Sequence, residues 1–571
     1  MFLRIIESFN ILDYLRIIES FNTVDYLLII LLTLLLYLFR FYHNYFTRPN
    51  PLPGPLPLPF ELQNLFFDGN FHQLTASLRQ KYGDICEFRL GGSRRIVLSK
   101  ANYLDNLLAP SKNLALFPTY ENSPAMNSLR NFGRGISLNN NYESWKVNKY
   151  FLVQSLSTPG FNEEAIKHNK DLFEVLDGYW NSLKKSQSCN DNWFEMDFVQ
   201  WINRFMTDNI SIIITGERGC SISSYYHSFN SDKSILESSL FDDPKVYNSD
   251  KFTRAIKAYL RGVSFFYFVH PFLRRYVPYF KNKANAVLES RDYMLKTIDN
   301  IIERRTFDLV NTPQKLKSKH DLLTNLITAN HDAKSKLTEF LPDQEIRTVI
   351  FDMFLAGTDT SSNTLCYIIY YICLNPHVKQ KMVEEIDLVF PDSSDTLSIT
   401  ANHLTRLKYC EAIIKEASRL MPVLPVAKRV ASAECEVAGY IWPAKTIFQL
   451  NYASIHMNEK YWTNPTVFDP DRFYLQNDLG ELNDDLSNFD QENKKSIHEK
   501  DKHSLVIFGG GIRSCPGKKL AMFNMLTFIA LTFKKYDVEL MDVDAPLKTH
   551  TDFIIHCLEL KIKIKPRKSS L

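Results

Sequence analysis

The chain has 571 residues, of which 45% are hydrophobic and 23% charged, an ordinary composition for a globular protein with a sizeable core. Its 67 basic and 64 acidic side chains leave a formal charge of +3, a balance that gives no reason to expect nucleic acid as a partner. The nine cysteines are odd in number and include no C-x-x-C pair, so neither a disulfide framework nor a structural zinc or iron–sulfur site is expected.

The chain opens with a tandem repeat. Residues 3–14 (LRIIESFNILDY) are followed by a near copy at residues 15–26 (LRIIESFNTVDY). Two copies are too few for a solenoid, which needs about three stacked units. We interpret residues 1–22 as a duplicated segment without a role of its own, with an amphipathic surface helix as the alternative.

An apolar stretch follows the repeat. Every residue from Tyr26 to Phe39 is apolar, aromatic or threonine, and a membrane-spanning helix needs about 20 mostly apolar residues. We expect a single transmembrane anchor over residues 23–46 rather than a signal peptide, because the start is acidic and no small-residue cleavage site follows. The positive-inside tendency then leaves the rest of the chain cytoplasmic. Residues 47–59, rich in proline, predict a stiff hinge.

Residues 60–571 are expected to form one catalytic domain, because no proline- or glycine-rich linker divides them. Helical periodicity dominates, and the strand-like stretches are short, such as 85–90 with 95–98, and 435–442. The prediction is a mainly α fold with small β-sheets. Residues 477–503 are almost wholly polar and predict an exposed loop.

Residues 508–517 read FGGGIRSCPG and have the features that a haem-thiolate site needs. A thiolate is stabilised near a helix N-terminus, and Pro516 is favoured in the first position of a helix predicted over 518–534. The glycines let the backbone pass close to a flat ring, and Arg513 is placed to pair with a haem propionate. A phosphate loop would need Gly-Lys-Ser/Thr, which is absent. We therefore predict that Cys515 is the axial ligand of a haem iron, with a loose regulatory haem site as the alternative.

The pattern F-x-x-G-x-R-x-C-x-G resembles the cysteine-ligand loop of cytochrome P450 enzymes, with every fixed position filled, including Phe508. The resemblance covers roughly residues 48–565, and it implies the cytochrome P450 fold, a haem b cofactor and a monooxygenase reaction with O2. Residues 356–361 (AGTDTS) lie in a predicted long helix, 343–374, and resemble the family's acid–alcohol pair. By resemblance, Asp359 and Thr360 would relay protons to dioxygen.

Weaker family motifs occur in the expected order. Glu416 and Arg419 resemble the E-x-x-R pair, and residues 468–473 (FDPDRF) resemble the segment that supplies a third partner, here Arg472. The resemblance implies a buried ion-pair network with a positional role. Arg429 follows ten residues after Arg419, where the family often has a propionate-binding arginine.

Trp145 and Lys149 resemble the family's W-x-x-x-R motif, whose members bind haem propionates, with lysine in place of arginine. The charge is kept but the bidentate fork is lost. Trp145 is alternatively a packed core aromatic. Lysines 146, 149, 518 and 519 would attract an acidic reductase if they cluster, and the alternative is an ordinary solvated face.

The resemblance also implies a substrate pocket and partners. The substrate is expected to be lipophilic, because the stretch 264–280 is strongly aromatic and suits a pocket roof or a membrane-dipping loop, with plain helix packing as the alternative. By family position, the pocket would draw on residues 113–135, 259–280, 350–356, 423–427 and 551–555.

An NADPH-dependent flavoprotein reductase would supply electrons, and the protein would sit in the endoplasmic reticulum membrane as a single-pass protein. Three alternatives stay open: a peroxide-using or hydroperoxide-rearranging haem-thiolate enzyme, a non-catalytic haem-binding protein, and a protein without haem. Retention of Asp359 and Thr360 speaks against the first two.

Overall fold

The chain is described by a computed structural model over residues 22–59, 70–90, 93–108, 114–120, 129, 133–186, 193–229, 244–269, 271–311, 321–335, 341–391, 399–474 and 502–567. Three predicted features lie wholly or partly outside the described residues: the duplicated segment up to residue 21, the polar loop up to residue 501, and much of the pocket segment 113–135.

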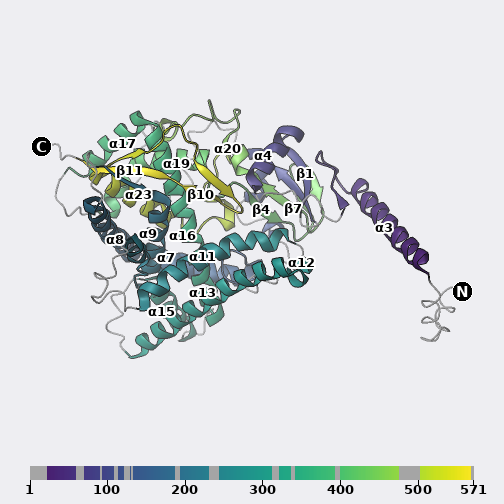
Figure 1. Cartoon of the computed structure of the whole chain (residues 1–571), viewed down its shortest axis with the longest axis horizontal. Coiled ribbons are helices and arrows are strands. Elements are labelled where there is room, and N and C mark those ends of the chain that lie inside the picture. The colour runs from purple at the N-terminus through teal and green to yellow at the C-terminus, as the bar shows by residue number, and fades with distance from the viewer. Residues whose placement is uncertain are drawn as a thin grey trace.

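Helices make up most of the structure (Figure 1). They are α3 (Thr23–Phe46), α4 (Phe71–Tyr82), α5 (Asp105–Leu108), α7 (Tyr142–Leu156), α8 (Pro159–Ser186), α9 (Phe198–Thr215), α10 (Ser221–Phe229), α11 (Pro244–Phe268), α12 (Pro271–Tyr276), α13 (Pro278–Asn311), α15 (Leu322–Ser335), α16 (Asp343–Leu374), α17 (Pro376–Val389), α18 (Ala401–Arg406), α19 (Lys408–Leu420), α20 (Tyr452–His456), α21 (Asp471–Tyr474) and α23 (Lys518–Lys535), with the short turns η2 (Ala101–Leu104), η3 (Leu114–Leu116) and η5 (Gly511–Arg513).

The strands form small sheets, so the predicted mainly α fold with small β-sheets is confirmed. The largest sheet has the order β1-β2-β7-β4, with β2 parallel to β7, and a second has the order β3-β11-β8. Two pairs, β5-β6 and β10-β9, complete the set. The strands are β1 (Ile85–Leu90), β2 (Ser93–Leu98), β3 (Phe194–Asp197), β4 (Ala427–Val430), β5 (Cys435–Val437), β6 (Tyr440–Trp442), β7 (Ile447–Leu450), β8 (Tyr536–Leu540), β9 (Lys548–Thr551), β10 (Ile555–Glu559) and β11 (Lys561–Pro566).

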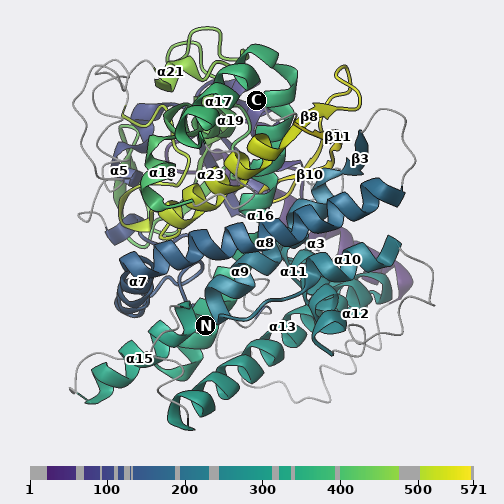
Figure 2. The same ribbon diagram turned by 90° about the vertical axis from the view of Figure 1, so that its left-hand side faces the viewer.

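Helix α16 runs through the body, and its bounds equal the predicted range 343–374. Asp343 and Glu345 in its first turn stabilise the helix, because their negative charges lie at the positive end of the helix dipole. Side chains along most of its length are buried, and it contacts α9, α13, α19 and α23. Figure 2 shows α7, α8 and α9 crossing the body between the group of α17, α18, α19 and α23 and the group of α11, α13 and α15.

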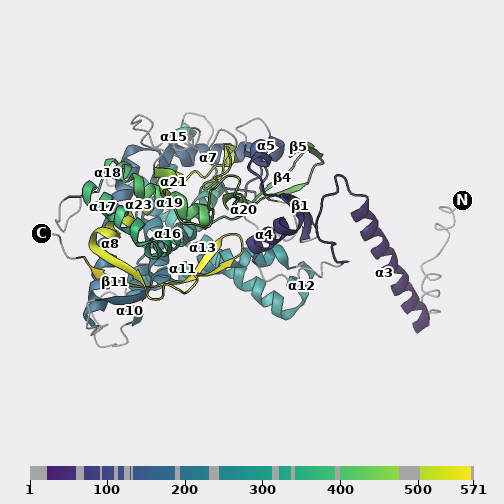
Figure 3. The same cartoon turned by 90° about the horizontal axis from the view of Figure 1, so that it is seen from above.

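Helix α3 stands apart from the body, beside the part that holds β1 and α4 (Figures 1 and 3). Its N-terminus has a capping box, in which Asn22 accepts from Asp25 N and the Asp25 carboxylate accepts from Asn22 N. Its apolar side chains are mostly exposed, and it is long and apolar enough to cross a membrane.

The proline-rich segment after α3 is bound to the β1–β2 hairpin. The buried carboxylate of Glu87 on β1 forms ion pairs with Arg48 and Arg94. The backbone joins in, because Glu87 N donates to Pro53 O at 2.9 Å. Gly54 lies so close that a Cβ there would be 1.9 Å from the Glu87 carbonyl oxygen. These contacts fix the direction in which the chain leaves the body toward α3.

Candidate active site

The cysteine loop, residues 506–517, is a tight turn that ends at α23. Cys515 N donates to Phe508 O at 2.8 Å, which closes the loop on itself. Gly509 and Gly511 have φ angles of +73° and +64°, a region that favours glycine. Helix α23 begins at Lys518 with Gly517 as its N-cap. The sequence had suggested that Pro516 occupies the first position of this helix. Pro516 instead precedes the helix.

The Cys515 sulfur has surroundings that suit a thiolate ligand. Burial raises the pKa of the Cys515 thiol above its ordinary value, although the Gly517 amide and the ammonium groups of Lys149 and Lys518 oppose the increase. Cys515 is nevertheless an exposed residue, so the loop leaves space beside it for a bound group. The cationic neighbours and the amide donor favour the deprotonated sulfur and so partly offset the effect of burial.

Three cations gather near this loop. Arg513 donates to the backbone oxygens of Ile136 and Asn139 at 3.0 and 2.7 Å, and burial together with nearby Arg429 lowers the pKa of Arg513 to about 9. Burial also lowers the pKa of Arg429. Lys149 Nζ donates to Ile512 O at 2.6 Å and lies 3.4 Å from Ser514 O. Among the described residues, no carboxylate forms an ion pair with any of these cations, although the charge of Asp352 acts on Arg513.

Trp145 lies among these cations and has an unused donor. Its side chain is 4% exposed, and its Nε1–H finds no acceptor in the described part of the chain. The Lys149 ammonium and the Arg513 guanidinium lie 5.0 and 5.2 Å from the ring centroid. Buried donors are nearly always paired. Cations without carboxylate partners beside an unpaired N–H therefore fit a ligand with carboxylate groups, and the propionates of haem are such groups.

The middle of α16 carries the predicted acid–alcohol pair. Thr360 Oγ1 donates to Ala356 O at 2.5 Å, and Ala356 is exposed although its helix is mostly buried. Asp359 is buried, and its Oδ1 has no partner within the described residues. Burial raises the pKa of Asp359, against the opposing charges of His556, Lys257 and Arg261. The acid therefore favours its protonated form more than a surface aspartate does.

A backbone segment connects α16 with the cysteine loop. Asp352 on α16 accepts from Ile136 N and Ser137 N, each at 2.8 Å. The same segment supplies the carbonyl oxygens to which Arg513 donates. Burial raises the pKa of Asp352 to about 6. Sequence reasoning missed this residue, because its partners lie more than 200 positions away along the chain.

The Glu416 network is fully formed. Arg419 Nε and Nη2 donate to the two Glu416 oxygens at 2.7 Å each, and neither side chain is exposed. Arg472 Nε donates to Glu416 Oε1 at 3.3 Å. Arg419 Nη1 also donates to the backbone oxygens of His456 and Pro465. The structure thus brings the three predicted partners together around one carboxylate.

The other predicted pocket segments contribute large apolar side chains. Ile555 N donates to Val423 O at 2.9 Å, which brings the β9–β10 turn to the segment after α19. Leu424 and Phe553 remain 40% and 38% exposed. On α11, Tyr259 packs its ring against Phe351 of α16, with centroids 5.4 Å apart.

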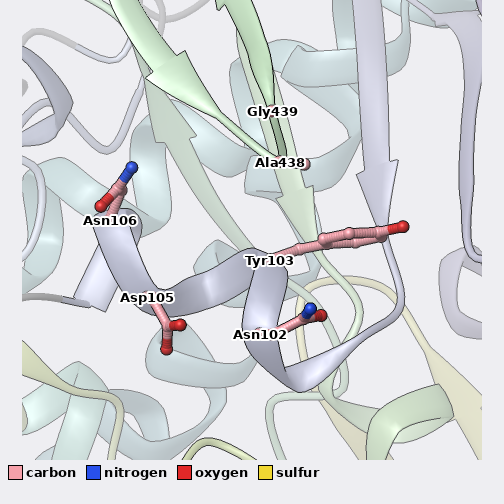
Figure 4. Close-up of a pocket in the computed structure, with 6 residues that line it drawn as sticks. All are labelled: Asn102, Tyr103, Asp105, Asn106, Ala438 and Gly439. Atoms are coloured by element: carbon pink, nitrogen blue, oxygen red, sulfur yellow. The ribbon is translucent and has the colours of Figure 1, made fainter.

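A separate hollow of about 370 Å³ lies between η2, α5 and the turn that joins β5 to β6 (Figure 4). None of the predicted site residues lines it, and its walls are mainly polar. Helix α5 also packs against the cysteine loop, where a Cβ on Gly510 would lie 3.2 Å from Leu108 Cβ. The residues that line the hollow are Asn102, Tyr103, Asp105, Asn106, Ala438 and Gly439.

A mainly helical fold with a cysteine loop that ends at a buried helix, beside cations without carboxylate partners, defines a haem-thiolate protein. The chain belongs to the cytochrome P450 family, because the family model for cytochrome P450 matches residues 51–566. It is a cytochrome P450 monooxygenase with haem b as cofactor.

Relatives span plants and animals. The chain is 25% identical to cytochrome P450 705A5 of Arabidopsis thaliana, over 82% of this chain and 81% of the relative. It is 24% identical to cytochrome P450 3A12 of Canis lupus familiaris, over 89% of this chain and 90% of the relative. The solved haem domain of cytochrome P450DA is 19% identical, covers 91% of this chain and 98% of its own, and has a TM-score of 0.68. The predicted cytochrome P450 fold is thus confirmed.

Proposed function

We propose that this protein is a membrane-anchored monooxygenase that hydroxylates or otherwise oxidises a lipophilic organic substrate, with electrons from an NADPH-dependent flavoprotein reductase. The observation that carries the proposal is the cysteine loop beside three cations and an unpaired indole N–H. Haem, when bound there, supplies the activation of dioxygen. The chain's own residues hold it, manage protons and select the substrate.

Cys515 would ligate the iron through its thiolate, which donates electron density and favours O–O cleavage. Arg513, Arg429 and Lys149 would neutralise the propionates, and Trp145 Nε1 would donate to one of them. Phe508 supports the loop, because its carbonyl oxygen holds Cys515 N at 2.8 Å. Glu416, Arg419 and Arg472 would act by position only.

Asp359 and Thr360 would carry protons. Thr360 Oγ1 is oriented by Ala356 O, and its own oxygen stays available as an acceptor. Asp359 holds a proton more readily than an exposed aspartate because burial raises its pKa. Asn363 fixes this part of the helix, since its side chain bonds Asp359 O and Cys557 N at 2.7 Å each. In this proposal Asp359 holds the proton, and the Thr360 hydroxyl passes a proton on after it turns away from Ala356 O.

The membrane assignment rests on α3 and on the proline-rich segment that joins α3 to the β1–β2 hairpin. We propose residues 1–22 as a duplicated extension, 23–46 as a single-pass anchor in the endoplasmic reticulum membrane, 47–59 as a hinge and 60–571 as a cytoplasmic catalytic domain. Support comes from the exposed apolar surface of α3 and from the ion pairs of Glu87 that fix the hinge. Protease protection of tagged protein in microsomes tests the orientation, and digestion of the catalytic domain only after detergent treatment would contradict it.

The absorption spectrum of the reduced protein with carbon monoxide tests the haem ligand. We expect the shifted Soret band that marks thiolate ligation, and its loss in Cys515→Ser. Cys220→Ser is the matched control, because Cys220 lies far along the chain and should leave the band unchanged. A folded wild type without the shifted band, or a Cys515→Ser variant that keeps it, would overturn the assignment.

Electron supply and substrate need separate measurements. Substrate-dependent NADPH consumption with added reductase supports the proposal, whereas turnover with peroxide alone would favour a peroxide-using or hydroperoxide-rearranging enzyme. A spectral binding screen with fatty acids, alkanes, sterols and aromatics tests the lipophilic pocket suggested by Leu424 and Phe553. Binding confined to small polar compounds would contradict it.

A further inference from the structure

His456, the last residue of α20, lies between the Glu416 network and the cysteine loop. Its side chain is fully buried. Its Nε2 accepts a hydrogen bond from Val506 N at 2.9 Å. Its backbone oxygen accepts from Arg419 Nη1, also at 2.9 Å. One residue thus contacts the arginine of the network with its backbone and the first residue of the loop with its ring.

The hydrogen bond to Val506 fixes the state of the imidazole. A backbone N–H can only donate, so Nε2 is an acceptor and the ring proton sits on Nδ1. Burial and the nearby Arg419 charge lower the pKa of His456 to about 3. The ring is therefore neutral at physiological pH, and Nε2 stays an acceptor. Tyr452 stacks beside it, with ring planes 10° apart and centroids 6.4 Å apart.

The loop passes this constraint on to Cys515. Val506 is buried and starts the loop, and two residues later Phe508 O receives the Cys515 amide. A shift of Val506 would therefore move the carbonyl that closes the loop. The far side of the loop is held separately, by Lys149 and by the Arg513 contacts. His456 is the described contact that joins the near side to Arg419.

We propose that His456 is a positioning residue, which transmits the geometry of the Glu416–Arg419 pair to the cysteine loop by holding the Val506 amide. The inference rests on the proposed ligation of iron by Cys515. It gives the buried ion-pair network a physical route to the ligand, since in the described part of the chain neither Glu416 nor Arg419 forms a hydrogen bond with the loop itself.

Three variants separate the hydrogen bond from packing. His456→Phe keeps a flat ring against Tyr452 but removes the acceptor. His456→Gln keeps an acceptor. Trp462→Phe is the matched control. The Trp462 ring centroid lies 5.2 Å from the Arg419 guanidinium, and its Nε1 has no partner among the described residues. The change therefore alters the surroundings of Arg419 without touching the bond between His456 and Val506.

The first readout is the rate at which the reduced carbon monoxide complex loses its shifted Soret band on mild warming. We expect His456→Phe to lose it several-fold faster than wild type, and His456→Gln to recover most of the difference. Equal rates in His456→Phe and wild type, or the same acceleration in Trp462→Phe, would overturn the inference. If His456→Phe does not fold, His456→Gln is compared with the shorter His456→Asn, and equal rates in those two overturn it.

The second readout is hydrogen exchange of the Val506 amide in the full chain, which does not depend on iron ligation. We expect faster exchange in His456→Phe and near wild-type exchange in His456→Gln. Unchanged exchange in His456→Phe overturns the inference by itself. A wild type that lacks the shifted band overturns the proposed function instead, and the amide measurement distinguishes the two failures.

Discussion

Replacing Asp352 by asparagine should remove a pH dependence from the stability of the fold. Asp352 accepts two backbone N–H groups of the 136–137 segment, and burial raises its pKa from 3.8 to about 6. Because the folded pKa lies above the unfolded one, the stability that this carboxyl contributes is full below about pH 4 and is lost as the pH rises through about 6. At about 1.4 kcal/mol per pKa unit, a shift of about two units corresponds to about 3 kcal/mol.

About half of that loss falls between about pH 5 and pH 8. The asparagine side chain can still accept from the segment but has no proton to release. The unfolding free energy of Asp352→Asn relative to wild type should therefore rise by about 1.4 kcal/mol over this interval, an upper bound because Asp352 is partly accessible. Urea unfolding followed by far-ultraviolet circular dichroism at both pH values measures it. A difference between variant and wild type that does not change with pH would refute the reasoning.

Lys149→Met should speed the loss of the shifted Soret band, because Lys149 holds a loop carbonyl oxygen and would also neutralise a propionate. With haem dimethyl ester the effect should shrink without vanishing, and an effect that the ester leaves unchanged would argue against the propionate contact. Glu87→Gln leaves Arg48 without its buried partner and should cost about 3 kcal/mol of unfolding free energy. Proteolysis of the hinge, residues 47–59, should become faster, and unchanged cleavage would argue that Glu87 does not hold the hinge in place. Gly262→Ala places a Cβ 2.2 Å from Val287 Cγ2 and should cost about 1–3 kcal/mol. A second change, Val287→Ala, should restore most of it in a double-mutant cycle, and additive losses would contradict this packing.

Local patterns predicted the long elements well and the short ones less well. Helix α16 has the predicted bounds because an acidic first turn, a long apolar run and Pro376 after its end all point the same way. The predicted strand-like stretch 435–442 is a hairpin, since Ala438 and Gly439 have positive φ angles of 54° and 80° and reverse the chain. A turn of this kind is set by two dihedral angles that an apolar pattern does not encode.

The candidate site divides in the same way. Cys515, Asp359 and Glu416 were accessible to sequence reasoning because each sits in a short motif. Asp352 and His456 carry no such signal, as single polar residues among apolar neighbours, and their roles come from partners distant in the chain. Short motifs predicted the groups that we propose to act on the cofactor, whereas the groups that hold the loop in place follow only from the packing of α16, α20 and the 136–139 segment.

The cations around the cysteine loop need hydrogen-bond acceptors from other parts of the chain to stay in place. Buried cations without carboxylate ion-pair partners are unfavourable, and the lowered pKa of Arg513 reflects that penalty. The fold tolerates it because backbone oxygens of residues 136 and 139 orient the guanidinium and the carbonyl oxygen of Ile512 orients the Lys149 ammonium. Those bonds keep the cations in place before a carboxylate ligand binds. The side chains therefore lose little conformational entropy when the ligand binds. We expect this preorganisation to favour a ligand that carries two carboxylates, as haem does.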